Sequence, residues 1–262
     1  MREIGRMPSL QESGFRERLI GAELLLGTFV KSPAIQAIEV LGDVGYDFVV
    51  LDAEHAPWDR GPMDVAILAA RASGMAALVR VDGIRAVLTA LDSGAAGVLV
   101  PHISSPAAAR ELVDAARYRG GRRGFTNSSR AGGYGRLGLA AHIAASDPHI
   151  AVVAMLEDPE ALDAADAIAS TDGIDAFFLG RGDLTVALGE TSTEAASVRD
   201  AVSRLAAAVR TAGKPLCAFV GTGREIGALR ELGVSTFIVS SELGLLRQAA
   251  AAELAQFQNH GA

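Results

Sequence analysis

Short runs of apolar and β-branched residues alternate along the chain with longer stretches rich in Ala and Leu. The short runs have the length and composition of buried strands, and they occupy residues 24–30, 46–52, 76–80, 96–100, 151–157, 174–179, 215–220 and 235–240. The longer stretches are typical of helices, and they occupy residues 33–43, 60–73, 83–92, 105–117, 159–170, 193–212, 223–232 and 242–257. Continuous apolar strands separated by helices predict an α/β protein with a parallel sheet covered on both faces.

The number of these units predicts the architecture. Eight strand–helix units in 262 residues match a single (β/α)8 TIM barrel spanning residues 1–262. A doubly wound open sheet is the alternative. We expect residues 8–20 to form an extra N-terminal helix that closes the barrel floor. Residues 118–137 form the one long irregular stretch and are rich in Gly and Arg, which predicts either an active-site flap or a solvated surface loop.

Composition narrows the classes of partner. No apolar run approaches the 18 residues of a membrane span, and residues 1–11 lack the apolar core of a signal peptide, so we expect a cytoplasmic protein. A net charge of −7 argues against nucleic acid as the main partner. Cys217 is the single cysteine, which excludes a disulfide framework and a cysteine-rich zinc site.

Lysine is scarce, and this restricts the possible mechanisms. Of the 24 basic residues only Lys31 and Lys214 are lysines. Lys214 precedes the seventh predicted strand and therefore lies at the wrong end of a barrel for catalysis. An aldolase that forms a Schiff base would have to use Lys31, which follows the first strand.

Polar and charged residues gather where the predicted strands end, which is where TIM barrels carry out their chemistry. These positions are Lys31, Asp52, Glu54, His55, Arg80, Pro101-His102, Glu157, Gly180–Asp183, Gly221–Gly223 and Ser240–Glu242. Gly221-Thr222-Gly223 is compatible with a phosphate-binding turn, but a tight turn capped by Thr222 is the favoured interpretation.

Three features of these strand ends have a chemical interpretation. Glu157 and Asp183 end neighbouring strands, and two carboxylates with room for water suit Mg²⁺ or Mn²⁺, although both could simply cap helix N-termini. His55 follows Asp52 closely enough for a carboxylate to orient it as a general base, and a surface histidine is the alternative. Arg80 ends an otherwise apolar strand, so its guanidinium is expected to bind a carboxylate of a substrate or of the protein.

Several motifs in order resemble the HpcH/HpaI aldolase/citrate lyase family of metal-dependent (class II) pyruvate aldolases. The resemblance covers about residues 20–250. It rests on LGTFVKSPAIQAIEVLGDVGYDFVVLDAEHAPWD, which contains Asp-x-Glu-His at residues 52–55, on Arg80, and on LDSGAAGVLVPHI. It continues with RYRGGRRG and SSRAGGYG, with Glu157 opening E-x-x-x-A-L, and with GRGDLTVALG at residues 180–189.

The resemblance implies a TIM barrel that cleaves or forms 4-hydroxy-2-oxo acids through a pyruvate enolate. Glu157 and Asp183 match the family's ligands for a divalent ion, which would be Mg²⁺, Mn²⁺ or Co²⁺. Arg80 matches the arginine that stabilises the enolate. His55 matches the base, and Asp92 matches an aspartate that pairs with a histidine, in some relatives across a subunit boundary.

The resemblance also implies substrate contacts and an assembly. Backbone N–H groups of Gly182 and Asp183 would receive the carboxylate of the 2-oxo acid, and Arg123 matches the arginine of the flap. The substrates would be a small 2-oxo acid and an aldehyde. The family implies a homohexamer, a trimer of dimers that exchange the last helix. Oxaloacetate decarboxylation, another C–C bond formation from the enolate, and a non-catalytic 2-oxo-acid-binding protein are the alternatives.

The chain departs from the family pattern around the site. Met155 replaces a usual Gln, Arg181 replaces a usual Pro, His102 replaces an apolar residue, and Ser240–Glu242 replaces Gly-x-Asp. Because the ligand and base positions are kept, these changes suggest altered substrate choice. Arg181 and His102 could bind a longer or more acidic acceptor at the mouth of the barrel.

Overall fold

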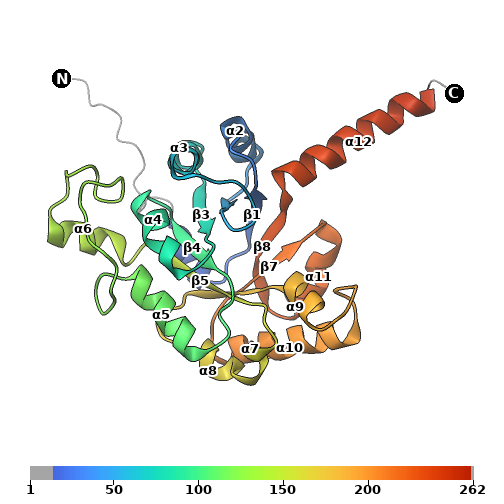
Figure 1. Cartoon of the computed structure of the whole chain (residues 1–262). Helices are drawn as coiled ribbons and strands as arrows, with labels where there is room; N and C mark the ends of the chain where they lie inside the picture. Colours follow the sequence, from blue (N-terminus) through green and yellow to red (C-terminus); the bar gives the residue numbers. More distant parts are fainter. Residues whose placement is uncertain (1–13, 261–262) are drawn as a thin grey trace.

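The structure, a computed structural model, describes residues 14–260 and contains a closed barrel of parallel strands. Each strand pairs with the next, and β8 pairs with β1 (Figure 1). The strands are β1 (Leu25–Val30), β2 (Phe48–Asp52), β3 (Ala76–Arg80), β4 (Gly97–Val100), β5 (Ala151–Leu156), β6 (Ala176–Leu179), β7 (Leu216–Val220) and β8 (Val234–Ser241). The predicted (β/α)8 barrel is confirmed, and the open sheet is wrong because β1 and β8 are joined.

Helices lie around the barrel, most of them on its outer surface. They are α1 (Phe15–Ile20), α2 (Ile35–Val44), α3 (Arg60–Ala72), α4 (Val87–Asp92), α5 (Pro106–Ala116), α6 (Leu139–Ser146), α7 (Glu160–Asp163), α8 (Ala165–Ala169), α9 (Arg181–Ala187), α10 (Ala196–Thr211), α11 (Ile226–Glu231) and α12 (Glu242–His260). Short 3₁₀ turns, η2 (Ile84–Ala86) and η3 (Gly223–Glu225), precede α4 and α11. The predicted helix 159–170 is interrupted at Ala164, which leaves α7 and α8.

Alternate residues of each strand fill the barrel interior, as the period of two in a strand requires. The interior cluster includes Phe29, Phe48 and Leu78. Gly27 of β1 lies beside Phe48 of β2, and a Cβ atom at residue 27 would lie 2.4 Å from the Phe48 ring. The intervening residues, such as Val49 and the neighbouring outward side chains, pack against the helices in a second, larger cluster.

Helix α1 closes the floor of the barrel. Phe15 and Leu19 are buried within the interior cluster, and the rings of Phe15 and Phe48 lie 5.3 Å apart. Arg16 of α1 binds Asp175, which precedes β6, with 2.6 Å between NH2 and Oδ1. The predicted floor helix is therefore present over residues 15–20, while the predicted residues 8–13 lie outside the described part of the chain.

Helix α12 leaves the barrel and projects away from it as a single long element (Figure 1). Apolar side chains along it are exposed, among them Leu246 at 65%, Leu254 at 59% and Phe257 at 76%. No helix within residues 14–260 is both long enough and apolar enough to cross a membrane.

Candidate active site at the barrel mouth

Charged side chains continue the inward-facing rows of the strands at the C-terminal end of the barrel. Each of them lies two positions after an apolar residue of the interior cluster. Side chains alternate along a strand, so these residues also point toward the barrel axis. They are Lys31, Asp52, Arg80 and Glu157. The strand register therefore brings together residues from four different βα units.

Asp52 is a buried carboxylate that binds two cations. Its Oδ1 accepts from Arg80 Nε at 2.9 Å, and its Oδ2 accepts from Arg80 NH2 at 2.8 Å and also from Lys31 Nζ. Burial opposes ionisation of the side chain, but the hydrogen bonds from Arg80 and Lys31 outweigh it and lower the pKa of Asp52 to about 2. Asp52 therefore stays ionised and holds Arg80 through two parallel hydrogen bonds.

Arg80 is fixed on a second side by an aromatic ring. Its guanidinium carbon lies 4.6 Å from the centre of the Phe29 ring, and its Nε lies 3.3 Å from Glu54 Oε2. The side chain is only 9% exposed. A guanidinium held by a carboxylate and stacked on a ring has little freedom, so Arg80 presents its charge in one orientation.

His55 lies beside this cluster with an accessible ring. Its backbone N–H donates to Asp52 Oδ1 at 3.2 Å, and its Nε2 lies 3.6 Å from Glu54 Oε2. The side chain is 56% exposed. The carboxylate next to the His55 imidazole is thus Glu54, while Asp52 fixes the backbone of the loop that carries it.

Glu157 is a second buried carboxylate, only 2% exposed. Its Oε1 accepts from the backbone N–H of His102 at 2.9 Å. Burial raises the pKa of Glu157 to about 7, and the charge of Asp183 adds to this effect. Asp183 lies in the first turn of α9 and is exposed. Gly180 leaves room for Glu157, because a Cβ at residue 180 would lie 2.3 Å from the Glu157 Cβ.

The Glu157 and Asp183 pair fits a divalent cation. The charge of Asp183 and burial both oppose ionisation of Glu157, and a positive ion bound by the two carboxylates would offset this cost. Within residues 14–260 no cluster of three or more His, Cys, Asp or Glu side chains has a metal-binding arrangement. Such a sparse donor set suits Mg²⁺ or Mn²⁺, which keep water or substrate oxygens as their remaining ligands.

His102 lies next to Glu157 and pairs with Asp158, a residue that sequence reasoning missed. Nδ1 of His102 lies 3.1 Å from Asp158 Oδ1, and this contact raises the pKa of His102 although burial opposes the shift. His102 has a φ of 57°, a left-handed conformation that is uncommon for a residue with a side chain. Because Asp158 directly follows Glu157 in the sequence, it could have been predicted to lie at the same end of the barrel.

Arg181 does not extend freely into the mouth of the barrel. Its NH2 donates to the Phe219 carbonyl at 3.0 Å and to Glu225 Oε2 at 2.5 Å. Glu225 in turn accepts from the Gly221 N–H at 3.1 Å through Oε1. Arg181 therefore connects the loop after β6 to the loop after β7, and its charge is balanced by Glu225. The Gly221–Gly223 turn carries the predicted cap, because Thr222 Oγ1 accepts from the Arg224 N–H.

Asp92 and Arg123 form a separate cluster outside the barrel. Asp92 ends α4, and its Oδ1 accepts from Arg123 NH2 at 2.9 Å. The Arg123 side chain is fully buried, with its guanidinium carbon 4.4 Å from the centre of the Tyr118 ring. Within this chain Asp92 pairs with Arg123 rather than with a histidine, and Arg123 has no solvent-facing surface for a substrate.

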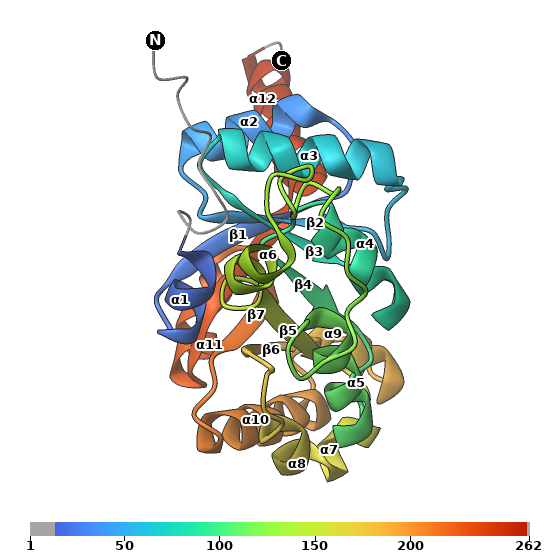
Figure 2. The ribbon, with the colours of Figure 1, turned by 90° about the vertical axis from the view of Figure 1, so that its left-hand side faces the viewer.

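The stretch 118–137 carries Arg123 and packs against the outside of the barrel. Arg130 binds Asp64 of α3, and the Ala131 N–H donates to the Asp92 carbonyl at 3.3 Å. Figure 2 shows the loop passing in front of α3 and α4 before it enters α6. Its contacts therefore join it to the outer helices α3 and α4.

Residues 25–249 match the HpcH/HpaI aldolase/citrate lyase family. The chain belongs to this family. The resemblance predicted from Asp52–His55, Arg80, Glu157 and Gly180–Gly189 is thereby confirmed. Membership in the HpcH/HpaI family identifies the chain as an enzyme of the lyase class, of the aldolase type.

Individual members of the HpcH/HpaI family resemble the chain over almost its full length. The 5-keto-4-deoxy-D-glucarate aldolase of Escherichia coli is 30% identical over 239 residues, which are 90% of this chain and 93% of that protein. The crystal structure of citrate synthase SbnG is 31% identical, with a TM-score of 0.84 over 94% of this chain and 98% of that one. A family member from Burkholderia cenocepacia is 28% identical, with a TM-score of 0.89 over 94% and 99% of the two chains.

Proposed function

We propose that this chain is a divalent-metal-dependent lyase that cleaves or forms 4-hydroxy-2-oxo acids through a pyruvate enolate. The observation that carries the proposal is that two buried carboxylates with different surroundings, Asp52 and Glu157, lie at the same mouth of the barrel. Asp52 is held ionised by Arg80 and Lys31, while the pKa of Glu157 is raised by burial and by Asp183. Asp52 fixes the positive charge of Arg80, whereas Glu157 and Asp183 lack a positive charge that a metal ion would supply.

Glu157 and Asp183 are the residues that would hold the metal ion. A bound Mg²⁺, Mn²⁺ or Co²⁺ would supply a Lewis acid for the negative charge that develops on a 2-oxo acid during C–C bond cleavage. The backbone N–H groups of Gly182 and Asp183, at the start of α9, would receive the carboxylate of the substrate.

Arg80 and His55 would carry the remaining chemistry. Arg80, oriented by Asp52 and by the Phe29 ring, would place its positive charge beside the developing enolate oxygen. His55, accessible to solvent and next to Glu54, would remove the proton from the 4-hydroxyl group in the cleavage direction and return it in the direction of synthesis. Asp52 would act by orienting Arg80 and the His55 backbone.

The environment of Lys31 disfavours the Schiff-base alternative. A lysine that forms an imine needs an apolar pocket or a cationic neighbour to release its proton. Lys31 instead donates to the ionised Asp52 carboxylate, and its ammonium group lies 5.6 Å from the centre of the Phe29 ring. Both contacts hold the Lys31 side chain against Asp52 and Phe29.

The proposal includes a homo-oligomer in which copies exchange α12. The helix carries exposed apolar residues at Leu243, Leu246, Leu254 and Phe257. These positions follow helical spacing along one stripe, which a second copy would cover. In a hexamer built as a trimer of dimers, Asp92 would face the His55 of a neighbouring copy, and Arg123 would hold its carboxylate in place.

A second candidate reaction uses the same enolate for a different bond. The likeness to citrate synthase SbnG and the apolar Met155 in the barrel interior favour oxaloacetate decarboxylation or C–C bond formation with another acceptor. Met155 is 1% exposed and lies two residues before Glu157, so it removes a polar donor from beneath the metal site.

A release assay distinguishes these candidates. The purified protein with Mg²⁺ or Mn²⁺ is given a series of 4-hydroxy-2-oxo acids, and pyruvate formation is followed. We expect metal-dependent release that stops with EDTA and in Glu157→Gln. Release from oxaloacetate alone would support the decarboxylase. The metal mechanism would be overturned if activity survived EDTA and borohydride trapped an imine between Lys31 and the substrate.

A further inference from the structure

A cavity of about 450 Å³ lies between α10 and α11. Its volume falls in the range of about 300–1,000 Å³ that is usual for small-molecule sites. Thr193 and Glu194 of the loop before α10, together with Arg181, complete its wall. Apart from Arg181, its lining contains none of the residues assigned to the proposed reaction, such as Glu157 and Arg80.

The floor of this cavity is apolar. Val202 of α10 and Leu229 of α11 are buried, with 4% and 5% of their surfaces exposed. Leu232, which is half-buried, and Ala228, which is exposed, extend the apolar surface toward the opening. The floor can therefore accept a hydrocarbon group but offers it no hydrogen-bonding partner.

The rim of the cavity is cationic. Three arginines and two glutamates line the cavity. Arg181 and Glu225 neutralise each other through their 2.5 Å contact. Arg199 donates to the backbone carbonyl of Glu194 at 2.9 Å, and neither Arg199 nor Arg224 forms an ion pair within residues 14–260. The guanidinium groups of Arg199 and Arg224 and the carboxylate of Glu194 are left at the cavity, so its net charge is positive.

We propose that this cavity binds a small organic carboxylate with an apolar body. The apolar part lies on Val202, Leu229 and Leu232, and the carboxylate accepts hydrogen bonds from Arg224 and Arg199. Charge complementarity favours this ligand class. A cationic amphiphile would be repelled by the two arginines, and a neutral one would form no charge-assisted hydrogen bond with them.

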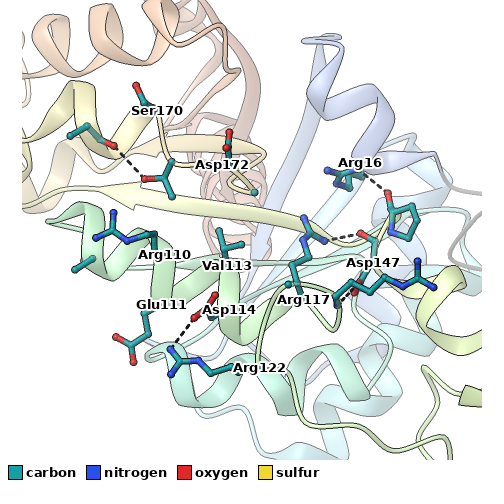
Figure 3. Close-up of a pocket in the computed structure, with 17 residues that line it drawn as sticks. Arg16, Arg110, Glu111, Val113, Asp114, Arg117, Arg122, Asp147, Ser170 and Asp172 are labelled. Atoms are coloured by element: carbon teal, nitrogen blue, oxygen red, sulfur yellow. Dashed lines mark hydrogen bonds and ion pairs between the residues drawn. The ribbon is translucent and has the colours of Figure 1, made fainter. Parts of the chain in front are cut away.

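A larger groove between α5 and α8 does not share these properties. It has a volume of about 1,200 Å³, and five arginines line it. Figure 3 labels Arg16, Arg110, Arg117 and Arg122 among them. Arg16 and Arg117 bind Asp175, and Arg122 binds Asp114. These ion pairs neutralise most of its positive charge, and polar atoms make up a larger share of its surface than of the cavity between α10 and α11.

Titration of the full chain with octanoate, followed by calorimetry and saturation-transfer NMR, tests the proposal. We expect saturable binding to one site per chain. Arg224→Gln should weaken it by at least about fivefold, because a charge-assisted hydrogen bond is lost. Ala228→Trp, at an exposed helix position, should fill the opening and abolish binding.

Matched controls separate this site from general adsorption. Arg230→Gln removes an exposed arginine of α11 that does not line the cavity, and it should leave octanoate binding unchanged. Octylammonium, with the same chain and the opposite charge, should not bind. Equal binding of octylammonium and octanoate, or binding that persists in Ala228→Trp, would overturn the proposal, as would the absence of saturable octanoate binding.

Discussion

Asp52 stabilises the barrel mouth because one buried carboxylate is shared by several donors. Arg80 approaches it from β3, Lys31 from the end of β1, and the His55 N–H from its own loop. A buried ion pair contributes stability only if its charges are fully matched, and removal of one partner leaves the others without compensation. The lowered pKa of Asp52 reports this match.

Replacement of Asp52 by Asn should therefore destabilise the fold in a pH-dependent way. A shift in pKa from 3.8 to about 2 corresponds to about 2 kcal/mol of unfolding free energy. Because the folded-state pKa is lowered, this contribution is complete above the unfolded value and is lost as pH falls toward about 2. Urea unfolding at several pH values measures it. The exposed Asp200→Asn serves as the control, and an Asp52→Asn deficit that did not shrink in acid would contradict the account.

Glu157 should make metal binding depend on pH in the neutral range. With a pKa of about 7 the carboxyl group is largely protonated in mild acid, so a metal ion must displace a proton. Mn²⁺ affinity should fall by about tenfold per pH unit below about 7 and level off above it. Calorimetry in buffers of different ionisation enthalpy also counts the released proton. A flat affinity profile would exclude Glu157 as the titrating ligand.

For single residues, the sequence predicted where a side chain lies in the barrel better than which residue it contacts. The period of two along each strand suffices to bring Asp52, Arg80 and Glu157 to one end of the barrel. It cannot tell that Lys31 pairs with Asp52, or that Arg123 pairs with Asp92, since both contacts depend on how loops from different units meet. The predicted roles of Asp92, Arg123 and Arg181 in binding or proton transfer stay predictions.

At the scale of elements, Arg181 links two loops of the barrel mouth. Arg181 follows β6, and Glu225 belongs to η3, after β7. Arg181→Ala and Glu225→Gln should each destabilise the protein, and the double variant should lose less than the sum, with a coupling of about 1 kcal/mol. Urea unfolding of the four proteins gives this coupling.

The same variants test whether Arg181 also contacts an acceptor. If Arg181 acts only through Glu225, Arg181→Ala should change KM for dicarboxylic acceptors and for short aldehydes by the same factor. A selective rise in KM for the dicarboxylic acceptors would instead show that Arg181 reaches the substrate.

Strand prediction succeeded because buried parallel strands are continuous apolar runs, whereas two helices were missed. Helix α6 follows the Gly- and Arg-rich stretch and carries small residues on most sides, so it lacks a clear apolar face. Helix α9 begins within the Gly180–Asp183 motif, whose glycines indicate a turn. Both helices are short, and tertiary packing stabilises them more than local propensity does.

At the scale of the whole molecule, α12 is the element that a single chain does not explain. Leu243, Leu246, Leu254 and Phe257 stay exposed, so no other part of residues 14–260 covers the apolar stripe of α12. Leu254→Glu combined with Phe257→Glu should dissociate the proposed oligomer, because it places charges where apolar contacts are expected. Sedimentation velocity measures the assembly. Gln248→Glu, on the opposite face of α12, is the matched control, and an unchanged assembly in the double variant would contradict helix exchange.

The proposed function requires this barrel mouth to stabilise a pyruvate enolate with the help of a metal ion. The most direct test is hydrogen–deuterium exchange at the methyl group of pyruvate in D₂O, followed by NMR, because it requires no knowledge of the acceptor. We predict exchange with Mg²⁺ or Mn²⁺ that stops with EDTA and in Glu157→Gln. An absence of exchange in the metal-loaded wild-type protein, or exchange unaffected by both treatments, would contradict the account.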